Sequence, residues 1–232
     1  MLLNTKQGIV ELEALRVQEI GSYAWGYNRA SSDHDMLVVY RDDPLRTIFG
    51  QQKPQVVNEP DTSYVVYRLS DFIVQCTKFN LNYYCYLWSN KYVYKTSKEI
   101  ECIKAWQAQY LSKLKEPWYK LCVQAVSCVS SYYTKRQAYK DLYRIAYMTD
   151  LAVQFNNSVE TKAIVDPYWA PQTTVTKQVH DLYLSKLDGP LSNEHDLLFE
   201  QVYQQSLEIR CPRFSLPKAT VDECVDLFRS GE

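Results

Sequence analysis

The spacing of apolar residues along this chain changes character near residue 70. Before that point, short apolar runs rich in β-branched and aromatic side chains occupy residues 35–40 and 64–68. After it, apolar residues recur every three or four positions for most of the remaining length. The first pattern is typical of strands and the second of amphipathic helices. The chain is therefore predicted to begin with a small sheet and to continue as helices.

Within the first part, residues 9–19 have an apolar pattern that fits either a helix or a strand. The glycine at position 21 favours an extended end to that segment, with a short helix over residues 22–27. Residues 35–40 form the clearest strand. The segment 41–61 contains three prolines and a glycine, which predicts a long loop. Residues 64–68 are expected to form a further strand.

In the second part, Ser70 is a candidate N-cap for the first helix, and residues 161–176 are expected to form a loop. Helices are expected over residues 72–79, 96–110, 117–129, 139–155, 175–186, 192–209 and 220–229. We therefore predict an α+β fold, in which a small mixed β-sheet with flanking helices is followed by a C-terminal helical bundle. The expected domains are residues 1–92 and residues 93–232.

Composition is that of an ordinary globular protein, because 46% of the 232 residues are hydrophobic and can form a packed core. The apolar runs are too short to span a bilayer, and the N-terminus lacks the apolar core of a signal peptide. We therefore expect a cytoplasmic protein with no membrane partner. The seven scattered cysteines contain no Cys-x-x-Cys pair, which argues against a zinc site.

Charge is unevenly distributed although the net charge is only −1. Residues 91–144 hold 11 basic and four acidic residues, a local charge of +7, and are rich in tyrosine and tryptophan. Interleaved cations and aromatic rings suit a polyanion whose bases can stack, such as RNA. A set of amphipathic helices with solvated lysines and buried tyrosines explains the same composition. Both interpretations remain open at this point.

The strongest chemical signal is Gly21-Ser22, followed after ten residues by Asp33-His34-Asp35 and an apolar run. Alternate side chains of a strand share a face, so Asp33 and Asp35 are predicted to lie about 7 Å apart on one face, with His34 pointing away. Two such carboxylates can bind a hard cation such as Mg²⁺. Taken alone, an Asp-x-Asp pair is more often a turn or a surface pair than a metal site.

These residues resemble the signature of the DNA polymerase β-like nucleotidyltransferase superfamily. Within it, the blocks Gly21–Gly26, Ser32–Asp35 and Val38–Tyr40 look most like a branch of bacterial and phage predicted nucleotidyltransferases, some of which are associated with RNA repair. A second block is similar to that branch's second motif. It comprises Tyr67-Arg68-Leu69, Phe72, Asn80-Leu81-Asn82 and Leu87-Trp88. The resemblance covers about residues 19–90 and implies a nucleotidyltransferase-type core.

The resemblance implies transfer of a nucleoside monophosphate from an NTP to a hydroxyl group, with Mg²⁺ or Mn²⁺ as the cofactor. Asp33 and Asp35 would be catalytic metal ligands. Gly21 would let the backbone approach the phosphates, and Ser22 would donate its hydroxyl to the β- or γ-phosphate.

The sequence departs from the family at the third carboxylate, which normally helps to hold the metal and activate the hydroxyl. Ser63 stands where an aspartate is expected, and Cys85 stands where the branch tends to have a glutamate. Asp61, two residues before Ser63, is the candidate replacement as third metal ligand and catalytic residue, with Glu59 as an alternative. Asp61 could equally be an ordinary loop residue.

Two basic residues, Lys140 and Arg144, are candidates for binding the triphosphate because they lie four positions apart on one helical face. Lys135 and Arg136 belong to the same basic group. The histidine that the branch often carries in this region is missing. An exposed structural helix face is the alternative explanation.

The leading functional hypothesis is thus a nucleotidyltransferase. Its acceptor is expected to be an RNA 3′ end first, a protein hydroxyl second and a small molecule third. The alternative is a catalytically degenerate protein of the same fold that binds nucleotide or another protein. A structural helical protein with a coincidental motif is the third hypothesis.

Overall fold

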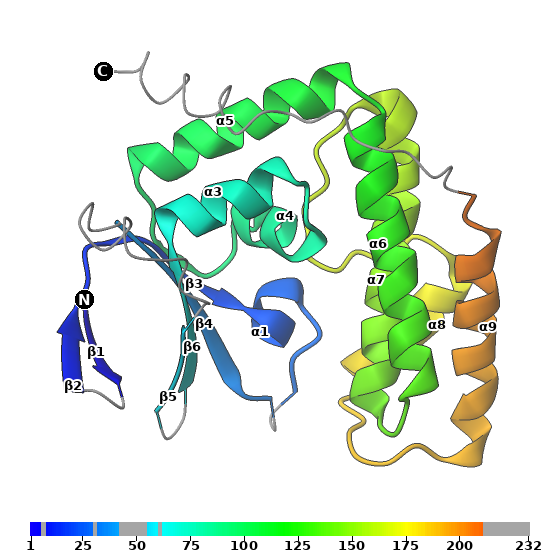
Figure 1. Cartoon of the computed structure of the whole chain (residues 1–232). Helices are drawn as coiled ribbons and strands as arrows, with labels where there is room; N and C mark the ends of the chain where they lie inside the picture. Colours follow the sequence, from blue (N-terminus) through cyan, green and yellow to red (C-terminus); the bar gives the residue numbers. More distant parts are fainter. Residues whose placement is uncertain (6–7, 30–31, 42–54, 60–61, 211–232) are drawn as a thin grey trace. The chain divides into compact units, whose positions relative to one another are not determined.

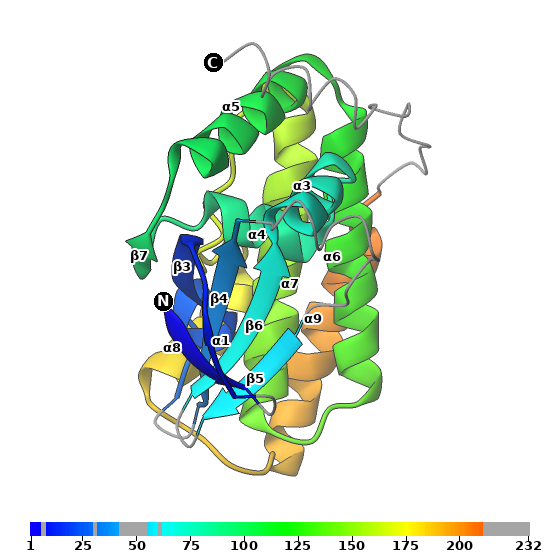
Figure 2. The same cartoon turned by 60° about the vertical axis from the view of Figure 1, so that its left-hand side comes forward.

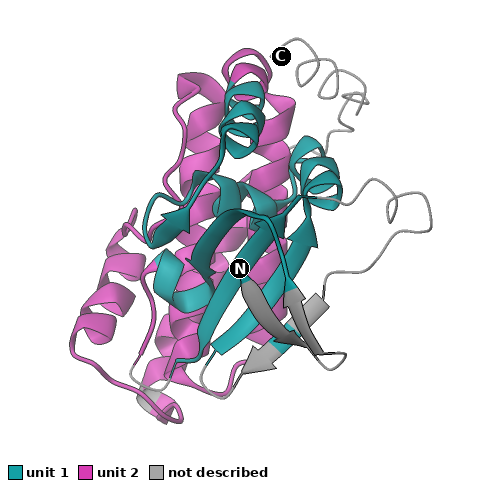
Figure 3. Cartoon of the chain, turned by 90° about the vertical axis from the view of Figure 1, so that its left-hand side faces the viewer, with its two compact units in different colours: residues 1–25, 31–108, 218–232 teal, residues 26–30, 109–217 magenta. Residues whose placement is uncertain are grey.

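The computed structural model of the chain describes residues 1–5, 8–29, 32–41, 55–59 and 62–210. The predicted helix 220–229 lies outside these residues. Contacts divide the chain into two compact units, coloured separately in Figure 3. Among the described residues, unit 1 contains those up to residue 25 and those from 32 to 108, and unit 2 contains residues 26–29 and 109–210. The division into domains at residue 92 stays a prediction.

Unit 1 is built on a five-stranded mixed sheet with the strand order β5-β6-β4-β3-β7. Its strands are β3 (Ala14–Ile20), β4 (His34–Tyr40), β5 (Gln55–Glu59), β6 (Thr62–Arg68) and β7 (Val93–Lys95). All neighbouring strands are antiparallel except β4 and β6, which run parallel. A separate hairpin is formed by β1 (Leu2–Thr5) and β2 (Gly8–Glu11).

Helices accompany this sheet in Figures 1 and 2. They are α1 (Gly21–Trp25), α3 (Leu69–Thr77), α4 (Leu81–Trp88) and the first part of α5 (Lys98–Lys113). The buried side chain of Arg16 on β3 donates to the carbonyl oxygens of Tyr86 (3.0 Å) and Ser89 (3.1 Å). A cation at the end of a helix satisfies carbonyls that have no partner within the helix. Arg16 therefore joins the sheet to the C-terminal end of α4.

The opposite face of the sheet has its own apolar cluster. Its buried members are Ala14, Val38, Val57 and Val66, and partly buried hydrophobic residues pack around them. Arg16 pairs with Val39 and Val17 pairs with Val38 in the β3–β4 ladder. Because successive residues of a strand alternate between faces, each strand contributes side chains to the face that holds Arg16 and to the face that holds the apolar cluster.

Unit 2 is helical. Its elements are the end of α5, α6 (Glu116–Thr134), α7 (Tyr139–Thr161), α8 (Thr174–Leu184), a 3₁₀ turn η1 (Asn193–His195) and α9 (Asp196–Glu208). Helix α7 is the centre of the unit, because α6, α8 and α9 all contact it. It is buried on most of its surface for the same reason.

The loop between α7 and α8 is attached to α7 by polar side chains. Tyr147 donates its hydroxyl to the carbonyl of Pro167 at 2.9 Å. The carboxylate of Asp150 accepts from the indole N–H of Trp169 at 2.7 Å and from the backbone N–H of Gln172 at 2.9 Å. The long segment after α7 is thereby held against the helix without regular structure of its own.

The α+β fold class is confirmed, since a mixed sheet is followed mainly by helices. The prediction of a loop throughout residues 41–61 is wrong at Gln55–Glu59, where β5 pairs with β6. Ser70 is not the cap of its helix, because α3 begins at Leu69 and its N-cap is Arg68. In the described part of the chain, no helix is long and apolar enough to cross a membrane.

Candidate functional site

Gly21 occupies the point where β3 ends and α1 begins. Its φ of +66° lies in the left-handed region that glycine adopts without strain. The preceding residue, Ile20, pairs with Asp35 across the β3–β4 ladder. A Cβ atom added to Gly21 would lie 3.0 Å from Oδ2 of Asp35. Gly21 is therefore needed both for the turn and for the close approach of this carboxylate to the backbone.

Ser22 follows within the first turn of α1 and is buried. Backbone N–H groups in the first turn of a helix have no acceptor within that helix. The turn at Gly21 thus brings the start of α1 close to the Asp35 carboxylate, and Ser22 is the next residue of that helix.

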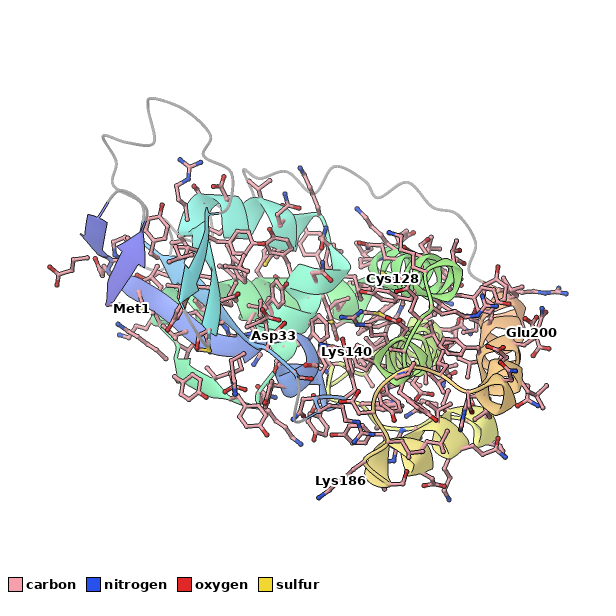
Figure 4. The ribbon with its side chains drawn as sticks, turned by 90° about the horizontal axis from the view of Figure 1, so that it is seen from below. Met1, Asp33, Cys128, Lys140, Lys186 and Glu200 are labelled. Carbon is pink, nitrogen blue, oxygen red and sulfur yellow. The ribbon has the colours of Figure 1, made fainter. Side chains whose placement is uncertain are left out.

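The two aspartates occupy different environments. Asp35 is the second residue of β4 and is half-buried, whereas Asp33 is exposed and precedes the strand. Asp33, labelled in Figure 4, lies outside the β3–β4 register, so its shared face with Asp35 stays a prediction. The imidazole of His34 lies near Glu19, which pairs with Met36 across the β3–β4 ladder. Met36 and His34 are two residues apart and share a face of β4, so His34 lies on the face opposite to Asp35, as expected.

The structure places Ser63 directly beside Asp35. These residues are partners in the parallel β4–β6 ladder, so the position predicted for a third carboxylate is adjacent to Asp35 and holds a hydroxyl. Asp61 lies outside the described residues, and its role as a ligand stays a prediction. Glu59 pairs with Thr62 in the β5–β6 ladder, one position from Ser63. Within the described residues, no three acidic, histidine or cysteine side chains form a group that could hold a metal ion.

Cys85 is buried in α4 and forms no disulfide bond. Burial of a thiol as a small apolar group is the ordinary environment of cysteine. A glutamate at this position, as the resemblance implies, would need a partner for its charge in the interior. The departure from the family pattern at Cys85 is therefore consistent with an apolar packing role.

Lys140 and Arg144 belong to unit 2, at the N-terminal end of α7. Arg144 donates to the carboxylate of Asp141 at 3.1 Å, and its guanidinium lies 5.5 Å from the ring centroid of Tyr132. Lys140, labelled in Figure 4, is partly exposed. Arg144 thus has structural partners within its own unit. Phosphate binding by this pair stays a prediction.

Glu19 is a residue near the motif that the pattern of the sequence did not single out. It is buried at the end of β3, and Oε1 accepts a hydrogen bond from the hydroxyl of Tyr94 at 2.7 Å. The second oxygen, Oε2, is buried without a hydrogen-bond donor. A charged residue in an apolar strand, two positions before the Gly-Ser turn, is the signal that could have identified it.

Comparison with known proteins adds no assignment. The sequence matches no protein-family profile and no curated protein sequence. The chemistry of the chain must therefore be argued from its own residues.

Proposed function

We propose that this protein transfers a nucleoside monophosphate from an NTP to a hydroxyl acceptor, with an RNA 3′ end as the first candidate. The observation that carries the proposal is the close approach of the Asp35 carboxylate to the Gly21 turn, in which Oδ2 lies 3.0 Å from the position of an added Cβ. A carboxylate against a glycine turn, with Asp33 two residues away, gives phosphates and a divalent cation a common place to bind.

The donor set suits Mg²⁺ in number and chemistry. Magnesium in phosphate-binding sites is commonly held by one or two carboxylates, with substrate phosphates and water completing its octahedron. Asp33 and Asp35 would supply two carboxylates, so the site would not need a third carboxylate at position 63. When bound, Mg²⁺ or Mn²⁺ would neutralise phosphate charge and favour ionisation of the attacking hydroxyl.

The residues of the chain have separate tasks in this proposal. Gly21 leaves space for the β- and γ-phosphates beside the backbone, and the Ser22 hydroxyl donates to one of their oxygens. The acceptor oxygen forms a bond to the α-phosphorus while the bond from that phosphorus to the bridging oxygen breaks. Pyrophosphate leaves with the bonding electrons, and the hydroxyl proton passes to a carboxylate or to solvent.

The direct test is incubation of the purified protein with α-³²P-labelled NTPs, Mg²⁺ or Mn²⁺ and a pool of single-stranded RNA. We expect label in the RNA, release of pyrophosphate and loss of both with EDTA. Thermal shift with each NTP should be measured on the same samples. NTP binding without any label transfer, to RNA or to protein, would contradict the enzymatic proposal.

One observation favours a second candidate, a nucleotide-binding protein that has lost catalysis. Ser63 is the β-ladder partner of Asp35, where the resemblance expects the third carboxylate. Such a protein would bind NTP with little dependence on Mg²⁺ and would release no pyrophosphate.

The Ser63→Asp variant separates the two candidates. If the site is degenerate, restoring a carboxylate beside Asp35 should create Mg²⁺-dependent transfer at least about 10-fold above the wild-type background. If two carboxylates suffice, or Asp61 acts as the third, the variant should gain less than about threefold. Ser63→Asn is the matched control, because asparagine has nearly the volume of aspartate but carries no charge. A gain shared by both variants would exclude the charge as its cause.

A further inference from the structure

Four aromatic residues are linked, directly or through one another, to Glu19 in unit 1. The Tyr94 hydroxyl donates to its Oε1, and Nδ1 of His34 lies 3.8 Å from the same oxygen. The backbone N–H of Glu19 donates to the carbonyl of Tyr92 at 3.0 Å. The ring of Tyr23 stacks on that of His34 with centroids 4.1 Å apart and an interplanar angle of 21°. We call Tyr23, His34, Tyr92 and Tyr94 the aromatic platform.

The platform faces solvent rather than the core. Tyr94 is 62% exposed and Tyr92 is 48% exposed, and the side chain of His34 is 46% exposed. The hydrogen bond to Glu19 raises the pKa of Tyr94, and the nearby phenol of Tyr92 acts in the same direction. Large exposed rings held in fixed positions are unusual for surface side chains without a partner.

The backbone and Glu19 explain why these rings are held in place. Strand β7 pairs with β3 at the edge of the sheet, as Figure 2 shows, and this pairing brings Tyr94 to Glu19. A ring that is already oriented loses less conformational freedom when a ligand stacks on it. Glu19 acts here as a positioning residue for Tyr94, because its buried carboxylate accepts the Tyr94 hydrogen bond and does not itself reach the surface.

Positive charge accompanies the rings. Lys91 precedes Tyr92, and Lys95 follows Tyr94, and both lysines are exposed. Exposed rings interleaved with lysines match single-stranded nucleic acid, whose bases stack on aromatic side chains while its phosphates attract cations. The carboxylate of Glu19 is buried beneath the rings, so it adds little repulsion toward a phosphate at the surface.

We propose that the aromatic platform binds the bases of single-stranded RNA, with Lys91 and Lys95 contacting its phosphates. Its place in the reaction, as the site that receives the acceptor strand, rests on the proposed function. The binding itself does not, because it needs neither NTP nor Mg²⁺. His34 belongs to the platform and is the chain neighbour of Asp33 and Asp35, with its side chain on the face opposite to that of Asp35.

The test is fluorescence anisotropy with a fluorescein-labelled, unstructured 12-nucleotide RNA, in EDTA and without NTP. Stacking on one aromatic ring changes affinity by about 10- to 100-fold. The Tyr92→Ala/Tyr94→Ala double variant should therefore bind at least about 10-fold more weakly than wild type. Tyr94→Phe keeps the ring and loses only the hydrogen bond to Glu19, so its affinity should fall below that of wild type but by less than in the double variant. Lys95→Ala should reduce the slope of log affinity against log salt by about 0.7.

Leu197→Ala is the matched control, because Leu197 in unit 2 is as exposed (64%) as Tyr94. It should bind RNA as wild type does, and circular dichroism should show that all variants are folded. Equal RNA affinity in wild type and the double variant would overturn the proposal, as would an absence of RNA binding or equal affinity for double-stranded RNA. If the double variant binds RNA more weakly but wild type transfers no label, the result would support the aromatic platform and contradict only the proposed function.

Discussion

The Asp35→Asn variant is expected to lose nucleotidyl transfer by at least about 100-fold while keeping its fold. The amide has nearly the same shape as the carboxylate, so it still fits against Gly21, where the carboxylate oxygen lies 3.0 Å from the position of an added Cβ. It lacks the negative charge that Mg²⁺ requires from its ligands. The measurement is the initial rate of label transfer to RNA at saturating Mg²⁺.

Asp181→Asn is the matched control for this change. Asp181 is an exposed residue of α8 in unit 2, so the same chemical replacement there should leave the rate within about twofold of wild type. Thermal unfolding of both variants should remain within a few degrees of wild type. Retention of more than about a tenth of the activity in Asp35→Asn would contradict its role as a metal ligand.

The second large effect concerns stability, at Asp150 in unit 2. Burial raises the pKa of this carboxyl group to about 6, although hydrogen bonds from Thr176, Gln172 and Trp169 act in the opposite direction. Asp150→Ala would leave the buried indole N–H of Trp169 and the partly buried backbone N–H of Gln172 without this acceptor. We expect the free energy of unfolding at pH 7 to fall by about 2–4 kcal/mol. Urea denaturation followed by circular dichroism measures the change.

The same carboxyl group predicts a dependence of stability on pH. Its pKa is higher in the folded chain than the ordinary value of 3.8, so the folded state binds a proton more readily than the unfolded state. Between about pH 4 and pH 6, the contribution of Asp150 to the free energy of unfolding should therefore decrease as pH rises. The total decrease should be about 3 kcal/mol.

Asp150→Asn isolates this contribution, because asparagine does not titrate and keeps one carbonyl acceptor. A control is needed because His180 has the opposite effect. Burial lowers the pKa of His180, so its contribution to the free energy of unfolding increases as pH rises. The difference between wild type and Asp150→Asn should change with pH in the range 4–6 and be constant above about pH 7. A difference that does not change with pH would show that Asp150 ionises as it does in the unfolded chain.

Much of the fold followed from local patterns. The strand at residues 35–40 and the long helix from Tyr139 were predictable because their apolar spacing repeats over several residues. Strands β5 and β7 were not predictable in the same way. Each is short and lies at an edge of the sheet, so its conformation depends mainly on pairing with β6 or β3.

One part of the candidate site depends on a single pair of strands. Gly21 and Asp35 lie close together because β3 and β4 are adjacent and antiparallel, whereas the roles of Ser22 and Asp33 stay predictions. Arg16 and Glu19 were missed because their partners lie about 70 residues further along the chain. A polar residue in an apolar strand gives no indication of which distant group will satisfy it.

The sequence by itself determined an α+β chain with a Gly-Ser turn and two nearby carboxylates, because these features depend on local spacing. Only the tertiary structure decided that Ser63 is the β-ladder partner of Asp35 and that Tyr94 is bound to Glu19. The physical reason is that strand register and sheet order depend on pairing between distant segments. The free energy of that pairing depends on both partners and cannot be read from either segment alone.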